Sequence, residues 1–174
     1  MLGMVAALLF TAICLKHAGS STCVSQDVLA GIGQQLLDRV FYTDTRELEQ
    51  AAFLTEQPDG SLACVLWPAT TERAASTFHG DVPADTIAVL HTHPRQWQDP
   101  SAQDGILSKQ LGLSVVVVTH GLITGVDPAG EVMRWHPYGK RFAGAPVCQA
   151  KTPPKTAPFG AALGIDAEAL PVVR

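Results

Sequence analysis

The chain has 174 residues, of which 47% are hydrophobic and 16% are charged, so it is long and apolar enough to form one globular domain. Its formal net charge is -4 and its pI is about 5.8, and no run of Lys or Arg offers a surface for a nucleic-acid backbone or an anionic membrane. The composition therefore excludes a disordered chain and argues against nucleic acid as a partner.

The amino-terminal stretch has the pattern of a targeting segment. Its first fifteen residues carry no charged side chain and are rich in Leu, Ala, Val and Met, and small residues follow at positions 18–21. Such a pattern is typical of a signal peptide, and the apolar run is shorter than the roughly 20 residues that cross a bilayer. We therefore expect residues 1–21 to form a signal peptide or a short apolar leader.

This expectation also predicts where the protein acts. A signal peptide predicts a periplasmic or secreted protein, which would contact a membrane only through an uncleaved leader. If residues 1–21 are not an export signal, we expect the protein in the cytoplasm.

The interpretation of the four cysteines depends on whether the leader is removed. Removal of the leader would remove Cys14 and leave Cys23, Cys64 and Cys148, an odd set. Cys23 and Cys148 flank the expected folded region, so a disulfide between them is one hypothesis, and three unpaired thiols are the other. Cys64 lies in an apolar run and is expected to be buried.

Three segments are expected in the first half of the domain. Residues 24–40 place apolar side chains at the spacing of an amphipathic helix, with Ser25 as a suitable cap. Residues 48–68 hold two apolar runs around Asp59-Gly60, a signal for a β-hairpin. Residues 69–85 are mixed and polar, and we expect an irregular segment over one side of the sheet.

Strands alternate with a helix in the second half. Residues 86–90 predict a strand, and residues 101–111 predict a helix that ends at Gly112. Four successive valines make residues 113–119 a strand buried on both faces, which we expect at the centre of the sheet.

A second hairpin and a tail complete the predicted order. The hairpin strands are expected at residues 122–126 and 131–136. The division is a leader at 1–21, a domain at 22–145 and a Pro-rich, loosely ordered tail at 146–174. The order of elements predicts an α/β fold with a mixed β-sheet flanked by helices.

The strongest chemical signal lies where the strand of residues 86–90 ends. His91 and His93 stand at alternate positions, so their imidazoles project from the same face. Pro94 ends the strand, and Ser101 caps a helix whose first turn contains Asp104. Two imidazoles and a carboxylate suit a zinc ion with one open position.

These residues also carry a resemblance to a known family. His91-Thr92-His93, seven further residues and Ser101-x-x-Asp104 resemble the signature of the JAMM (MPN-type) zinc metallopeptidases, His-Ser/Thr-His-x7-Ser-x-x-Asp, position by position. The resemblance covers about residues 24–136 and implies a JAMM/MPN, cytidine-deaminase-like architecture. It also implies one Zn2+ per chain, bound by the two histidines and the aspartate.

The family has a glutamate well upstream, at the start of an apolar strand. Glu49 fits this context. Glu47, its nearest competitor, does not lead into the apolar run with the same spacing, and Glu56 lies on the turn side of the strand. The resemblance implies that Glu49 is the general base for a zinc-activated water. It implies that Ser101 hydrogen-bonds the oxygen of the tetrahedral intermediate, beside its possible role as a simple helix cap.

The implied function is zinc-dependent hydrolysis of a peptide or isopeptide amide bond in a peptide or protein substrate. Two alternatives stay open: a non-catalytic MPN-fold binding or scaffold protein, and a zinc-binding accessory protein of an envelope machine. The complete ligand set favours the peptidase, because scaffold members of the superfamily usually lack the ligands. An exported enzyme would act on a peptide, a protein precursor or a cell-wall crosslink, whereas a cytoplasmic one would remove a ubiquitin-like modifier.

Overall fold

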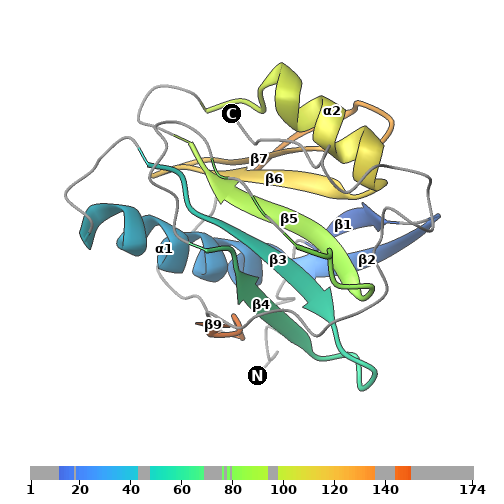
Figure 1. Ribbon diagram of the computed structural model, residues 1–174, viewed down its shortest axis with the longest axis horizontal. Helices are drawn as coiled ribbons and strands as arrows, with labels where there is room; N and C mark the ends of the chain where they lie inside the picture. The colour runs from blue at the N-terminus through green and yellow to red at the C-terminus, as the bar shows by residue number, and fades with distance from the viewer. Residues whose placement is uncertain are drawn as a thin grey trace, which may run out of the picture.

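The chain folds into an α/β domain, shown as a computed structural model in Figure 1. The structure describes residues 12–17, 19–42, 48–68, 76, 78, 80–93, 98–135 and 144–149. Within these residues, two helices and a seven-stranded mixed sheet form the body of the domain, and a two-stranded hairpin packs beside it. The predicted fold class, a mixed sheet flanked by helices, is confirmed.

The elements follow one another as the sequence pattern suggests, with one hairpin added at the start and one short strand at the end. In chain order they are β1 (Ala12–His17), β2 (Ser20–Ser25), α1 (Gln26–Tyr42), β3 (Ala51–Glu56), β4 (Leu62–Leu66), β5 (Thr86–Thr92), α2 (Ala102–Leu111), β6 (Ser114–Val118), β7 (Ile123–Val126), β8 (Val132–Trp135) and β9 (Cys148–Gln149).

The central strand of the large sheet is β5. The strand order is β8-β7-β6-β5-β3-β4-β9; β5 runs parallel to β6 with α2 as the crossover, and antiparallel to β3. The sequence predicted the centre at residues 113–119, which contain β6. That strand is buried throughout, but it is the neighbour of the central one, because the β3–β4 hairpin and β9 extend the sheet beyond β5.

Both predicted hairpins are confirmed. β3 and β4 are antiparallel around Gly60, whose φ of 80° lies in the left-handed region that favours glycine, and Asp59 accepts a hydrogen bond from the Ser61 amide (2.9 Å). β7 and β8 are antiparallel around a turn that starts at Asp127. The turn residues therefore fix the register of both hairpins.

Helix α1 covers one face of the sheet. It was predicted at residues 24–40 and begins after Ser25, whose hydroxyl accepts a hydrogen bond from the Asp27 amide (3.2 Å). Its inner side chains lie in a core with β1 and β2. Gly33 brings the helix close to β6, because a Cβ at this position would overlap the side chain of Val118.

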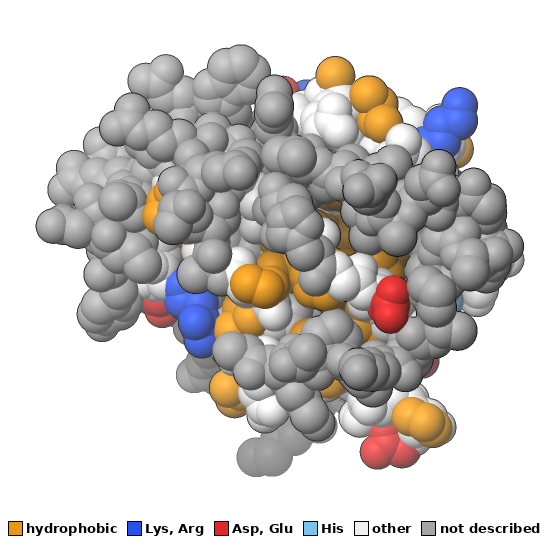
Figure 2. Space-filling view, in the orientation of Figure 1, with side chains coloured by type: hydrophobic (Ala, Val, Ile, Leu, Met, Phe, Trp, Pro, Cys, Tyr) orange, Lys and Arg blue, Asp and Glu red, His pale blue; other side chains and the backbone are white. Residues whose placement is uncertain are grey.

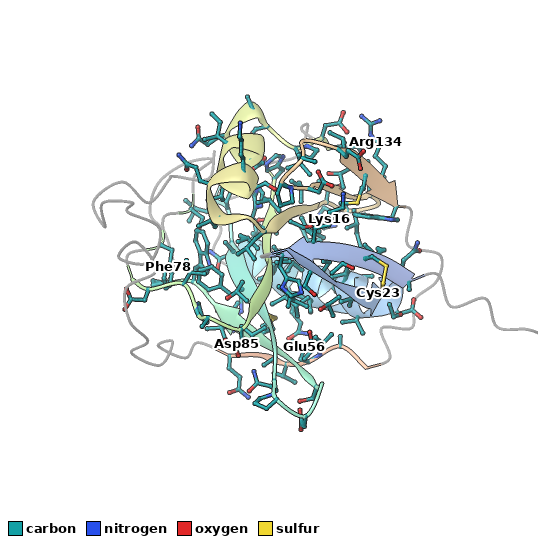
Figure 3. All side chains as sticks on the ribbon, turned by 90° about the vertical axis from the view of Figure 1, so that its right-hand side faces the viewer. Lys16, Cys23, Glu56, Phe78, Asp85 and Arg134 are labelled. Carbon is teal, nitrogen blue, oxygen red and sulfur yellow. A yellow bond between two sulfur atoms is a disulfide. The ribbon has the colours of Figure 1, made fainter. Side chains whose placement is uncertain are left out.

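The opposite face carries α2 and a separate aromatic core. Phe53, Trp67 and Phe78 form a cluster with ring centroids 4.8 to 5.4 Å apart. Phe78 and Val82 come from the predicted irregular segment, and both are buried against this face. In Figure 3, Phe78 and Cys23 lie on opposite sides of the sheet.

Residues 12–17 and 19–21, which the sequence assigned to the leader, are part of the folded domain. β1 and β2 form an antiparallel hairpin, and Ile13 and Leu15 of β1 are buried in the core beneath α1. The apolar side chains of β1, which suggested a signal-peptide core, therefore have another purpose: they fill the hydrophobic core of the domain. Residues 1–11, the rest of the predicted leader, lie outside the described residues.

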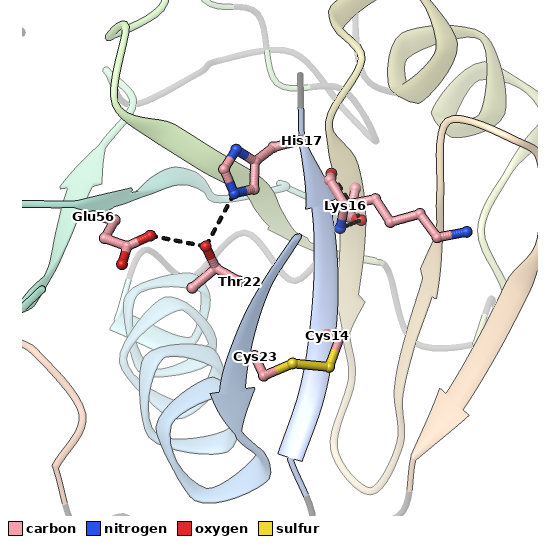
Figure 4. Close-up of a disulfide and its surroundings, with 7 residues drawn as sticks. Cys14, Lys16, His17, Thr22, Cys23 and Glu56 are labelled. Carbon is pink, nitrogen blue, oxygen red and sulfur yellow. Dashed lines mark hydrogen bonds between the residues drawn. A yellow bond between two sulfur atoms is a disulfide. The ribbon is translucent and has the colours of Figure 1, made fainter. Parts of the chain in front are cut away.

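Polar contacts attach this hairpin to the large sheet. Lys16 forms an ion pair with the buried carboxylate of Asp127 (2.5 Å). His17 Nε2 shares a hydrogen bond with Thr22 Oγ1 (3.0 Å), and the same hydroxyl donates to Glu56 at the end of β3 (2.8 Å), as Figure 4 shows. Both strands of the hairpin are thus attached to the large sheet, β1 through Lys16 and β2 through Thr22.

The structure corrects the predicted pairing of the cysteines. Cys14 is bonded to Cys23, its cross-strand partner in β1 and β2 (Figure 4), and Cys64 is bonded to Cys148. The Cys23–Cys148 hypothesis is wrong, and so is the alternative of free thiols. Both bonds join residues that the sheet register places directly opposite each other, and cysteine spacing alone does not reveal that register.

The predicted tail begins inside the sheet. Its residues Cys148 and Gln149 form β9, parallel to β4. Gln35 of α1 holds this strand, donating to the Pro146 carbonyl (2.9 Å) and accepting from the Cys148 amide (2.8 Å). The rest of the predicted tail, residues 150–174, lies outside the described residues, and in the part of the chain that is described no helix has the length and apolar character needed to cross a membrane.

The basic side chains of the described residues do not form one patch on the face shown in Figure 2. They lie apart from one another, at the left and at the upper right of this view.

Candidate metal centre

The two histidines stand at the end of the central strand. β5 is buried along its whole length and is paired on both sides, with β3 and with β6, so the position of its end is fixed. His91 and His93 occupy alternate positions and lie on one face, with ring centroids 4.8 Å apart. The predicted arrangement of the two imidazoles is present.

Asp104 comes from the first turn of α2, as the sequence predicted. Ser101 is the N-cap: its hydroxyl accepts from the Asp104 amide (3.2 Å), and the Asp104 carboxylate accepts from the Ser101 amide (2.6 Å), which together form a capping box. The helix ends at Gly112, whose φ is 64°. Capping holds the carboxylate at the helix start, where the helix dipole favours negative charge.

The three side chains converge on one buried point. Ligand atoms of His91, His93 and Asp104 all lie within 4.8 Å of one another. Asp104 Oδ1 is 3.2 Å from His91 Nε2, and Oδ2 is 3.4 Å from His93 Nε2. All three residues are buried.

Burial sets the charge state of the centre. It lowers the pKa of the His91 imidazole to about 4, although Asp104 favours the charged form. His91 is therefore neutral at pH 7 and keeps a ring-nitrogen lone pair for a metal. Burial opposes ionisation of Asp104, but the neighbouring imidazoles and the Ser101 donors outweigh it, so the pKa of Asp104 is lowered and the carboxylate stays charged.

Glu49 lies beside His93. The Thr92 amide donates to the Gln50 carbonyl (2.9 Å), and the Gln50 amide donates to Thr92 Oγ1 (3.0 Å), so the segment before β3 runs alongside the end of β5. Continuing the β3–β5 register by two residues places Glu49 opposite His93, on the same face. Glu49 is only 1% exposed, and among the described residues its Oε2 has no hydrogen-bond partner.

The environment of Glu49 favours its protonated form. Burial raises the pKa of this carboxyl to about 8; the nearby His93 lowers it, and Asp104 raises it further. A buried carboxyl that titrates close to neutral pH is typical of a group that exchanges protons with a ligand.

The donor set suits a metal ion. Within the described part of the chain, His91 Nδ1 is buried without a hydrogen-bond partner, and His91 Nε2 and Asp104 Oδ1 make no hydrogen bond, their contact with each other at 3.2 Å being an ion-pair contact only. Neutral imidazole nitrogens and carboxylate oxygens are common ligands of divalent transition metals. The group of His91, His93 and Asp104 could therefore hold a metal ion, and three protein ligands leave a position open for a further molecule.

One residue of the centre received no role from the sequence. The hydroxyl of Thr92 accepts a hydrogen bond from the Gln50 amide and so joins the segment that contains Glu49 to β5, the strand that ends at the histidines. The signal for this role was weak, because a threonine between two strand histidines points to the opposite face from them.

Comparison with known proteins gives no match: no protein-family model, no curated protein and no solved structure matches this chain. The class of protein is therefore described by its fold and its site. It is an α/β domain with a buried His-His-Asp group and an adjacent buried glutamate.

Proposed function

We propose that this protein is a zinc-dependent hydrolase of the JAMM (MPN) type that cleaves a peptide or isopeptide amide bond. The observation that carries the proposal is the convergence of Glu49, His91, His93 and Asp104 from three separate segments. The match of residues 91–104 to the family signature and the mixed sheet with a helix on each face both support it, and a JAMM/MPN architecture belongs to the same proposal.

The three ligands and the glutamate divide the work between them. His91, His93 and Asp104 would hold the zinc ion, which when bound supplies the Lewis acidity that makes a water molecule nucleophilic near neutral pH. Glu49 is the proposed general base: the charge of the bound zinc would lower the pKa of its carboxyl, and the carboxylate would then take the proton of the attacking water and hand it to the leaving amine. Its burial keeps that proton from bulk solvent.

Ser101 is the proposed donor to the oxyanion that develops on the amide carbonyl. Its hydroxyl donates to Asp104 Oδ2 (2.8 Å), which places it at the ligand cluster. Rotation of the hydroxyl toward the oxyanion would leave Asp104 held by the Ser101 amide, so the serine would serve both the helix and the reaction.

For the substrate we propose a peptide, a protein precursor or a cell-wall crosslink outside the cytoplasm. The two disulfides support this choice, because disulfides persist in oxidising compartments and are rare in the cytosol. A ubiquitin-like modifier would be the substrate of a cytoplasmic protein.

The test is Glu49→Gln, a change that removes the base but keeps the shape of the side chain. We expect zinc to be retained and hydrolysis of a peptide and isopeptide panel to fall about 100-fold or more. Asp104→Asn should lose the metal as well, because a neutral amide replaces a ligand carboxylate. Glu56→Gln is the matched control: Glu56 is at the far end of β3, the strand that Glu49 precedes, and the variant should keep both properties.

Zinc content and turnover together separate the alternatives. A wild-type protein that binds no zinc, or a Glu49→Gln variant with full turnover, would contradict the proposal. A wild-type protein that binds zinc but cleaves nothing in the panel would instead favour the zinc-binding accessory protein.

A further inference from the structure

A row of residues crosses the sheet at the level of His91. In register order, its members are Ala51, His91, Val117, Thr124 and Arg134. Side chains at directly opposed positions of neighbouring strands point to the same face. Thr124 of β7 therefore shares the face of the candidate metal ligand, two strands away from it.

The last two members of the row bind the segment that precedes α2. Thr124 Oγ1 donates to the carbonyl of Gln98 (2.7 Å), and Arg134 Nε donates to Asp99 (2.9 Å). The Thr124 side chain is 0% exposed, whereas the side chains of Arg134 and Asp99 are 57% and 58% exposed. Exposed ion pairs contribute little, so the buried hydroxyl is the stronger anchor.

This segment joins the two halves of the ligand set. It lies in the chain after His91 and His93, at the end of β5, and leads into the cap Ser101 and the carboxylate of Asp104. Through Thr124 it is tied to the same row of the sheet as His91. One rigid sheet therefore sets the position of ligands that come from a strand and from a helix.

We propose that Thr124 is a positioning residue for the metal centre: its hydroxyl holds residues 98–101 so that Asp104 meets the two imidazoles at metal-binding distance. This inference rests on the proposed function. Thr124 hydrogen-bonds the main chain of Gln98 and acts on the ligands through this segment, in the manner of the outer-shell groups that orient metal ligands.

The test compares three variants for zinc affinity, measured by competition with a chromophoric chelator. Thr124→Val keeps the shape and removes the donor, Thr124→Ser keeps the donor, and Arg134→Gln is the control for the exposed contact. We expect Thr124→Val to weaken zinc binding about tenfold or more, and the other two variants to stay near the wild type. Cobalt(II) in place of zinc should give an altered visible spectrum only in Thr124→Val.

A stability measurement separates positioning from folding. Thr124→Val keeps the shape of the side chain and Gln98 is an exposed residue, so we expect the variant to stay folded at the temperature of the zinc titration, as measured by denaturant unfolding. Thr124→Ala removes the same hydroxyl and repeats the test should the valine variant unfold.

The outcomes distinguish this inference from the proposed function. Unchanged zinc affinity and an unchanged cobalt spectrum in Thr124→Val would overturn the inference, and so would equal weakening in Thr124→Ser. A wild-type protein that binds no zinc would overturn the proposed function instead.

Discussion

Ser101 joins the stability of α2 to the proposed chemistry, and substitutions can separate the two roles. Ser101→Ala removes the cap and one donor to Asp104, so we expect the free energy of unfolding to fall by about 0.5 to 2 kcal/mol. We also expect kcat to fall about 100-fold, the usual loss for one oxyanion donor. Denaturant unfolding and turnover of the same preparation measure both.

The control for this prediction is Ser101→Thr, which keeps a hydroxyl that can cap the helix. It should recover most of the stability and much of the activity. A Ser101→Ala variant that loses stability but keeps kcat would assign the serine to the helix alone.

Among single residues, the sequence predicted the grouping of His91, His93 and Asp104, which the structure shows, and it did not predict the hydrogen bond of Thr124 to the segment before α2. His91 and His93 are two positions apart on one strand, and Asp104 stands at a capping distance from Ser101, so local geometry alone brings each pair together. Thr124 gave no signal, because its partner is a main-chain carbonyl 26 residues away in sequence. A hydrogen bond to a main-chain carbonyl requires no particular residue type at the partner position, so the sequence holds no pattern that predicts it.

Among the elements, the link between β1 and the β7–β8 turn should respond to pH. Burial opposes the ionisation of Asp127, but the hydrogen bond from Lys16 and the amides of Glu131 and Ala129 outweigh it, so the pKa of Asp127 is lowered. A carboxyl with a folded pKa below its unfolded value stabilises the fold above its ordinary pKa of 3.8. That stabilisation is lost as the pH falls through the lower folded value.

We therefore expect Asp127→Asn to be less stable than the wild type near neutral pH, and the difference to shrink at about pH 3. Denaturant unfolding at both pH values measures it. Glu131→Gln is the control, because Glu131 is 76% exposed and 3.7 Å from Lys16 and should contribute little at either pH. A difference that stays constant with pH would show that the carboxylate charge plays no part.

Elements with a strong local pattern were predicted, and those defined by distant partners were not. Turn residues and apolar alternation located β3–β4 and β7–β8, and the spacing of apolar side chains located α1. β9 contains two residues and exists because β4 lies beside it. No window of sequence carries that information.

At the scale of the whole molecule, the amino-terminal hairpin contributes to the core. Leu15 is 0% exposed, so Leu15→Ala should reduce the free energy of unfolding by about 2 to 5 kcal/mol, measured by denaturant unfolding. Ile106→Ala, on the exposed side of α2, is the control and should have little effect. Equal stability of Leu15→Ala and the wild type would contradict the packing of β1 against the domain.

The likeness of residues 12–17 to part of a leader has a physical origin. A strand whose alternate side chains fill a core and a signal-peptide core are both short, apolar and nearly free of charge. A core strand differs from a signal-peptide core only in having a surface to pack against. Here that surface is formed by α1 and the large sheet, whose residues lie far along the chain.

The Cys64–Cys148 disulfide has a consequence for the chain as a covalent object. It closes a ring across a sequence separation of 84 residues, and this ring contains His91, His93 and Asp104. Glu49 lies outside the ring, on the segment that leads into it. A single backbone break within the ring would therefore leave all three ligands and the glutamate in one covalently connected molecule, so long as the disulfide stays oxidised.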